Sequence, residues 1–198
     1  MFLNHSAAFT SFEPVTTDMD APQKRMPIPA MIAGTMVETE TGWTPVERLS
    51  LGDAVYTLEG GPAPIADLRQ IRLSAGTQLW HVPGGALGNC DDLLLTRDQH
   101  VMITDNDAEA MFDTPYVLIP APALQGFRGT RRIDCVPGAI AVEMTFDAEE
   151  IVYANSGTLM HCAAMSGLSD GFFRTLSTAE ARIFLAMQNT NDAVLMAA

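Results

Sequence analysis

The chain has 198 residues and a formal net charge of −13, from 11 basic and 24 acidic side chains. This charge argues against duplex DNA, RNA or an anionic membrane surface as partner, because each of them would repel it. Hydrophobic residues make up 47% of the chain, yet no apolar run reaches the roughly 20 residues of a membrane helix, so we expect a folded domain with neither a nucleic-acid nor a membrane partner.

Residues 1–27 contain Ser, Thr, Asp and Pro without periodicity, which predicts a flexible N-terminal arm. The first residues lack the basic start and apolar block of a signal peptide. Three widely spaced cysteines, Cys90, Cys135 and Cys162, do not form the pattern of a disulfide framework. A cytoplasmic location is therefore the default expectation, with export by a non-classical route left open.

Residues 28–165 contain many short apolar runs separated by turn signals. Turns are predicted at Thr41-Gly42, Gly52-Asp53 and Gly60-Gly61, with a short helical step at Val46 to Leu49. Two further runs are divided at Arg97 to Gln99. This spacing favours an all-β body, a sandwich or barrel-like domain, over alternating βαβ units.

Residues 166–198 form a predicted helical extension. Ser177 and Glu180 have the spacing of a capping box, and Ala179, Ile183 and Met187 follow at i, i+4 and i+8. We interpret this stripe as the face of an amphipathic helix that packs on the β-body. The alternative is a helix that binds a protein partner of unknown identity.

Metal and cofactor sites have little support in the sequence. The four histidines, His5, His81, His100 and His161, include no H-x-x-x-H pair, and the cysteines include no C-x-x-C pair. The glycine-rich stretch Pro83 to Asn89 has no following lysine or helix pattern, so we expect a loop there and not a phosphate cradle. We predict neither a metal nor a cofactor.

The order of motifs nevertheless resembles a known family. Gly34-Thr35, then "GWTPVERLSLGDAVYT" and "GGPAPI", are similar to the opening of a Hint (Hedgehog/intein) domain, and above all to its bacterial, alphaproteobacterial-type branch. The likeness continues through "VPGGALGN", "LLLTRDQHVMI", "YVLIPAPALQGFRG" and "EEIVYANSGTLMHC". It implies a flattened, horseshoe-like β-domain that cleaves or splices its own chain.

Hint chemistry, as the resemblance implies it, begins with a Cys or Ser that attacks the preceding carbonyl, aided by a T-x-x-H block. The nucleophile position falls on Ala30, whose methyl group cannot attack. The block falls on "TRDQH", one residue too long, so that either Thr96 or Arg97 takes the threonine place while His100 fits. At the far end His161 matches the penultimate histidine, but Cys162 replaces the asparagine that would cyclise.

Three interpretations remain open at this stage. The first is a Hint domain with a degenerate site formed by Ala30, Thr96, His100, His161 and Cys162. The second is an active self-cleaving domain, with another nucleophile or with Ala30 as an engineered replacement. The third is a non-catalytic domain that binds a protein.

Overall fold

The computed structural model describes residues 29–167 and 172–197; the predicted flexible arm, residues 1–27, lies outside the described residues. Two antiparallel sheets account for most of this part of the chain. The first sheet has the order β11-β7-β8-β1-β12-β6, formed by Arg131–Asp134, Gln78–Val82, Leu93–Leu95, Ala30–Ile32, Ile140–Thr145 and Asp67–Arg72.

The second sheet has the order β10-β9-β14-β13-β2-β4-β5, with β3 paired to β2. Its strands are Tyr116–Pro120 (β10), His100–Thr104 (β9), Thr158–Cys162 (β14), Glu150–Ala154 (β13), Met36–Thr39 (β2), Ala54–Thr57 (β4), Gly61–Pro64 (β5) and Gly42–Pro45 (β3). The helices are α1 (Asn106–Phe112) and α2 (Thr178–Ala197), with 3-10 turns η1 (Val46–Arg48), η2 (Ala121–Leu124) and η3 (Phe127–Gly129). None of the described helices is long and apolar enough to span a membrane.

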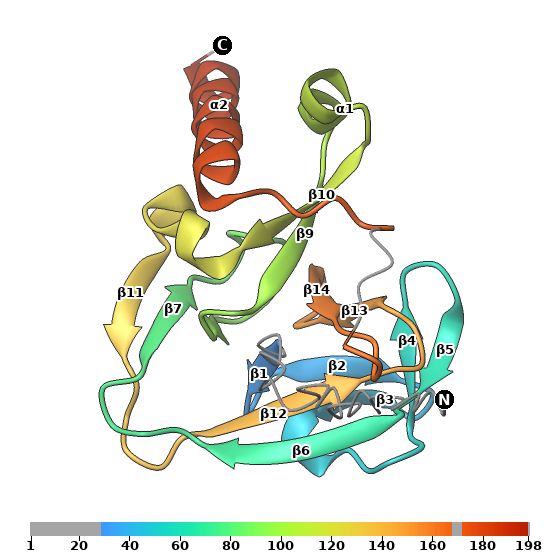
Figure 1. Cartoon of the computed structure of the whole chain (residues 1–198). Helices are drawn as coiled ribbons and strands as arrows, with labels where there is room; N and C mark the ends of the chain where they lie inside the picture. Colours follow the sequence, from blue (N-terminus) through green and yellow to red (C-terminus); the bar gives the residue numbers. More distant parts are fainter. Residues whose placement is uncertain (1–28, 168–171, 198) are drawn as a thin grey trace, which may run out of the picture.

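One main core joins the two sheets and the C-terminal helix. It contains Leu95 and Val142 from the first sheet, Val37 and Val152 from the second, and Phe184 from α2. Figure 1 shows both helices at one end of the molecule, beyond β9 and β10, and β6 and β12 at the other end. The predicted all-β fold with a C-terminal helix is confirmed.

The opening motifs form one interlocked unit. The backbone N–H of Gly34 donates to Glu47 Oε2 at 2.8 Å, and the N–H of Val46 donates to the Thr35 carbonyl at 2.9 Å. Gly34 has a φ of 94°, in the left-handed region that favours glycine. The Gly-Thr and Pro-Val-Glu segments are therefore tied to each other directly after β1, which fixes how that strand leaves the sheet.

The glycine-rich stretch is a loop, as predicted, and Asn89 holds it closed. The Asn89 side chain accepts from the N–H of Leu87 at 2.9 Å and donates to the carbonyls of Pro83 and Asp91 at 2.9 and 2.8 Å. A Cβ on Gly157 would lie 2.4 Å from the Gly88 carbonyl oxygen. The loop is thus packed against the β13–β14 turn, backbone against backbone.

Helix α1 was not anticipated from the sequence. Its N-cap is Asp105, whose side chain accepts from the N–H of Asp107 at 2.8 Å, and it ends at Asp113 in the left-handed conformation. A helix of 7 residues is too short to show an apolar period, and its one buried residue is Ala108. The signal that the sequence offered for this helix was Asp105, because aspartate is a preferred N-cap residue.

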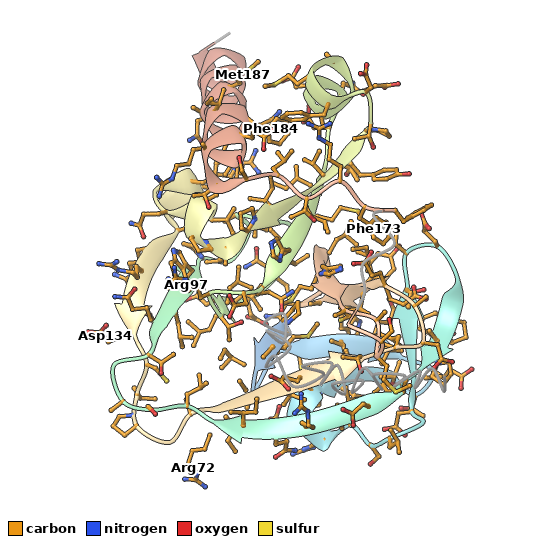
Figure 2. All side chains as sticks on the ribbon, viewed as in Figure 1. Arg72, Arg97, Asp134, Phe173, Phe184 and Met187 are labelled. Atoms are coloured by element: carbon orange, nitrogen blue, oxygen red, sulfur yellow. The ribbon has the colours of Figure 1, made fainter. Side chains whose placement is uncertain are left out.

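The helix α2 exists, but its predicted buried face is wrong. Ala179 is exposed, and Ile183 and Met187 are 60% and 42% exposed. The buried positions are instead Ala181, Phe184, Leu185 and Gln188. Phe184 stacks edge-on against Phe112 of α1, with ring centroids 6.0 Å apart, on the side of α2 that faces α1 in Figure 2. Burial of that aromatic ring, together with a 3.2 Å hydrogen bond from Gln188 to Asp107, decides which face packs.

Gly52 offers a test of the turn that starts β4. Its φ is 86°, and its N–H donates to the Ile65 carbonyl at 3.0 Å. Because a β-branched side chain strongly resists this conformation, we expect Gly52→Val to lower the free energy of unfolding by about 1–2 kcal/mol and the melting temperature by about 2–8 °C.

The matched control is Gly52→Asn, because asparagine tolerates a left-handed backbone. No neighbouring atom lies within 4 Å of a Cβ at this position, so backbone strain alone separates the two variants. Thermal melts followed by circular dichroism measure the difference. Equal melting temperatures for Gly52→Val and the wild type would contradict the assignment.

Candidate functional site

Strand β1 brings Ala30 into the middle of the first sheet. Ala30 pairs with Glu143 on β12, and Met31 lies between Val142 on β12 and Leu95 on β8. All three residues of β1 are buried. Both edges of the strand are paired, so the backbone at Ala30 is fixed by its neighbours.

Thr96 is the side chain that contacts Ala30. It follows β8 directly, and its hydroxyl donates to the Ala30 carbonyl oxygen at 2.9 Å. Arg97, the other candidate for the threonine place, is exposed. Of the two, Thr96 is therefore the one within hydrogen-bond reach of this backbone.

The extra residue of "TRDQH" is taken up by a tight turn. The N–H of Gln99 donates to the Thr96 carbonyl at 3.2 Å, which leaves Arg97 and Asp98 at the tip. Gln99 is fully buried, and its Nε2 donates to the backbone carbonyls of His100 and His161, each at 2.9 Å. Gln99 thus joins β9 to β14 at their ends.

Sequence reasoning missed Gln99. It stands three residues after Thr96, which is the T-x-x-H spacing, and the histidine comes one residue later. The spacing itself was the signal that could have found it.

His100 and His161 meet as a pair. The β9–β14 register, Met102 with Leu159 and Val101 with Met160, places them opposite each other at the strand ends. Their ring centroids lie 6.1 Å apart with an interplanar angle of 88°. Contacts therefore connect Ala30 to both histidines through Thr96 and the turn that follows it. A close approach of the His100 ring to the Pro29–Ala30 peptide stays a prediction.

Buried polar atoms without hydrogen bonds surround this pair. His161 Nε2 lies 3.4 Å from Glu149 Oε1, but the two are not aligned for a hydrogen bond. Gln99 Oε1, Glu149 Oε2 and His161 Nδ1 also have no hydrogen-bond partner in the described part of the chain. Such groups are rare in folded proteins and mark a place where water or a substrate group fits.

Burial controls the charge of the two histidines. It lowers the pKa of His100, and the neighbouring His161 lowers it further, while Asp98 opposes the shift. Burial also lowers the pKa of His161, against the opposing effect of Glu149. At neutral pH both rings are therefore uncharged, and each can accept a proton on one nitrogen.

Cys162 is not placed as a nucleophile. It is buried, and burial raises the pKa of its thiol far above the ordinary range, so the reactive thiolate does not form. It follows His161 directly on β14, and neighbouring strand residues point to opposite faces, so the two do not form a dyad.

No group of three metal-ligating side chains occurs within residues 29–167 and 172–197. His5 lies outside the described residues. His81 lies apart from the two other histidines of the described chain, on β7, where its Nε2 contacts Asp92 Oδ2 at 2.8 Å.

Solved structures share the fold. The bacterial intein-like domain from Clostridium thermocellum is 19% identical, aligns over 68% of this chain and 99% of its own, and has a TM-score of 0.50. The gp41-1 intein is 13% identical, aligns over 66% of this chain and 97% of its own, and has a TM-score of 0.45. None of the curated proteins compared with the chain matches it.

A family model described as "Hint domain" matches residues 29–159. This range begins one residue before Ala30 and takes in Thr96 and His100. It covers more than half of the sequence, and the chain therefore belongs to the Hint domain family.

Proposed function

We propose that this Hint domain does not cleave the peptide bond before Ala30 and that it acts as a folded, non-catalytic domain. The observation that supports the proposal is Ala30, which carries only a methyl side chain at the position that the resemblance assigns to the nucleophile and whose carbonyl accepts from Thr96. An acyl shift needs a hydroxyl or thiol on that carbon, so no ester or thioester forms there.

The C-terminal half of the chemistry is also unsupported. Cyclisation needs a side-chain carboxamide after His161, and Cys162 has none. The buried, protonated thiol does not replace it. The alternative, an active domain in which Ala30 replaces a Cys or Ser, requires the rest of the site to be competent, and this is open to direct test.

We expect the purified chain to keep its full-length mass during incubation with dithiothreitol or hydroxylamine, because these reagents release a fragment only from a thioester or ester. Intact-mass spectrometry makes the measurement. A fragment that begins at Ala30 would overturn the proposal.

The variant Ala30→Cys separates the two interpretations. We expect it also to stay intact, because Thr96 bonds the carbonyl of residue 30 and not that of Pro29, and Gln99 occupies the T-x-x-H spacing with an amide, which cannot act as a general acid. Ala30→Ser, tested with hydroxylamine, is the matched control for the oxygen nucleophile. Thiol-dependent cleavage of Ala30→Cys would show that Ala30 is the single defect.

The lowered pKa values of the histidine pair predict a pH dependence of stability. A histidine with a lowered native pKa binds fewer protons in the native state than in the unfolded chain, so its contribution is complete above the ordinary value of 6.5 and is lost as the pH falls below it. Each histidine adds at most about 1.4 kcal/mol per pH unit to the acid-side slope.

Chemical denaturation between about pH 7.5 and pH 5 measures this slope, since that window brackets the ordinary histidine pKa. We expect His161→Gln to have a shallower slope than the wild type, whatever its stability at neutral pH. His100→Asn provides the second variant for the other member of the pair. Wild-type slopes in both variants would contradict the prediction.

A second candidate function is protein binding through α2. The observation in its favour is the exposed stripe that contains Ile183 and Met187. We expect the double variant Ile183→Lys/Met187→Lys to melt within about 1 °C of the wild type, because exposed substitutions change stability by less than about 0.5 kcal/mol, and to bind less of a hydrophobic dye.

The control is Phe184→Ala on the buried side of the same helix, where the side chain is fully buried and the expected loss is about 3–5 kcal/mol. A large loss of stability in the double lysine variant would show that the stripe is packed and not free to bind a protein.

We propose that the protein resides in a reducing, cytoplasmic compartment, and the free thiols of its cysteines support this location. Cys90, Cys135 and Cys162 are all free, and Cys90 is exposed. An exposed free thiol is stable in a reducing compartment and is oxidised outside it.

A further inference from the structure

Three arginines line one surface cavity in this acidic protein. The cavity measures about 720 Å³, and Arg97, Arg132 and Arg182 surround it together with Trp80, Gln78 and Gln125. They are three of the 11 basic residues that oppose 24 acidic ones in the chain.

The fold brings these residues together from distant parts of the sequence. Arg132 on β11 pairs directly with Trp80 on β7, and the Arg132 N–H donates to Gln125 Oε1 at 2.8 Å. Arg97 comes from the turn between β8 and β9, and Arg182 comes from α2, which packs on η2. Figure 2 shows Arg97 on the same side of the molecule as β7 and β11.

None of the three arginines forms an ion pair with a carboxylate in the described part of the chain, although other arginines do. Arg69 pairs with Glu143, and Arg174 with Glu180. Asp134 lies two residues along β11 from Arg132, and no ion pair joins them. The three guanidinium groups at the cavity are therefore not engaged by a carboxylate of the described chain.

We propose that this cavity binds a small organic anion that carries at least two carboxylate or phosphate groups. Guanidinium groups recognise such groups through two parallel hydrogen bonds, and three of them around one cavity suit a ligand with separated charges. The volume lies in the range of small-molecule sites, and Trp80 in its lining offers an apolar contact for the carbon part of the ligand. The site is independent of peptide-bond cleavage.

Isothermal titration calorimetry with two probes tests the proposal, in a buffer of low ionic strength that contains no phosphate. Citrate represents the carboxylate source and fructose 1,6-bisphosphate the phosphate source, so the tighter binder identifies the anionic group. We expect one of them to bind with one site per chain, and binding to weaken as salt is added.

The variants Arg132→Gln and Arg97→Gln should each weaken binding by about ten- to a hundredfold, the effect of losing a charged hydrogen-bond donor. The matched control is Arg72→Gln, which removes the same charge from β6, at the other end of the molecule in Figure 2, and should change the dissociation constant by less than about twofold. Since these side chains are exposed, melting temperatures should stay near the wild-type value, and Arg97→Gln serves if Arg132→Gln is unstable.

The absence of binding for both probes at millimolar concentration would overturn the proposal. So would an equal loss of affinity in Arg72→Gln and Arg132→Gln, because it would show attraction by overall charge in place of a defined site.

Discussion

The enclosure of β1 is the constraint on which the rest of the structure depends. This strand has only three residues, yet it pairs with β12 on one edge and with β8 on the other, and all of it is buried. Because β1 lies inside the sheet, its backbone is held by contacts from segments that are distant in the sequence. Glu47 bonds Gly34 just after the strand, and Thr96 bonds the carbonyl of Ala30 at its start. The geometry of the junction is thus kept by structural contacts, whatever side chain residue 30 carries.

The histidine pair is surrounded by polar groups of two kinds, those that hold the strands together and those that do not. Gln99 bonds two backbone carbonyls and so closes β9 onto β14, which is a structural task. Gln99 Oε1, Glu149 Oε2 and His161 Nδ1 are buried and have no hydrogen-bond partner in the described part of the chain, which marks a place where water or another polar group fits. They make the surroundings of the histidine pair polar, and this environment does not depend on the side chain at residue 30.

Much of this architecture could be predicted from the sequence, because turns are local. The left-handed backbone of Gly52, the hairpin between β4 and β5 and the division of β8 from β9 each depend on a few adjacent residues. The buried face of α2 could not be predicted in the same way. An apolar stripe was present at Ile183 and Met187, but the partner surface, with Phe112 of α1, is distant in sequence and selects Phe184 instead. At the site, the sequence shows that residue 30 is an alanine, but it does not show that Gln99 is buried.

The extra residue of "TRDQH" links these observations. A T-x-x-H block would pass from Thr96 to its histidine without spare length, whereas here the turn at residues 97 and 98 absorbs one more residue. The extra residue affects both the interior and the surface of the protein. In the interior, Gln99 occupies the buried position, and the His100 ring contacts the His161 ring. On the surface, Arg97 lines the same cavity as Arg132 and Arg182. The one turn at residues 97 and 98 therefore places an amide, Gln99, in the interior and a cation, Arg97, at the surface cavity, so that the same short segment contributes to both environments.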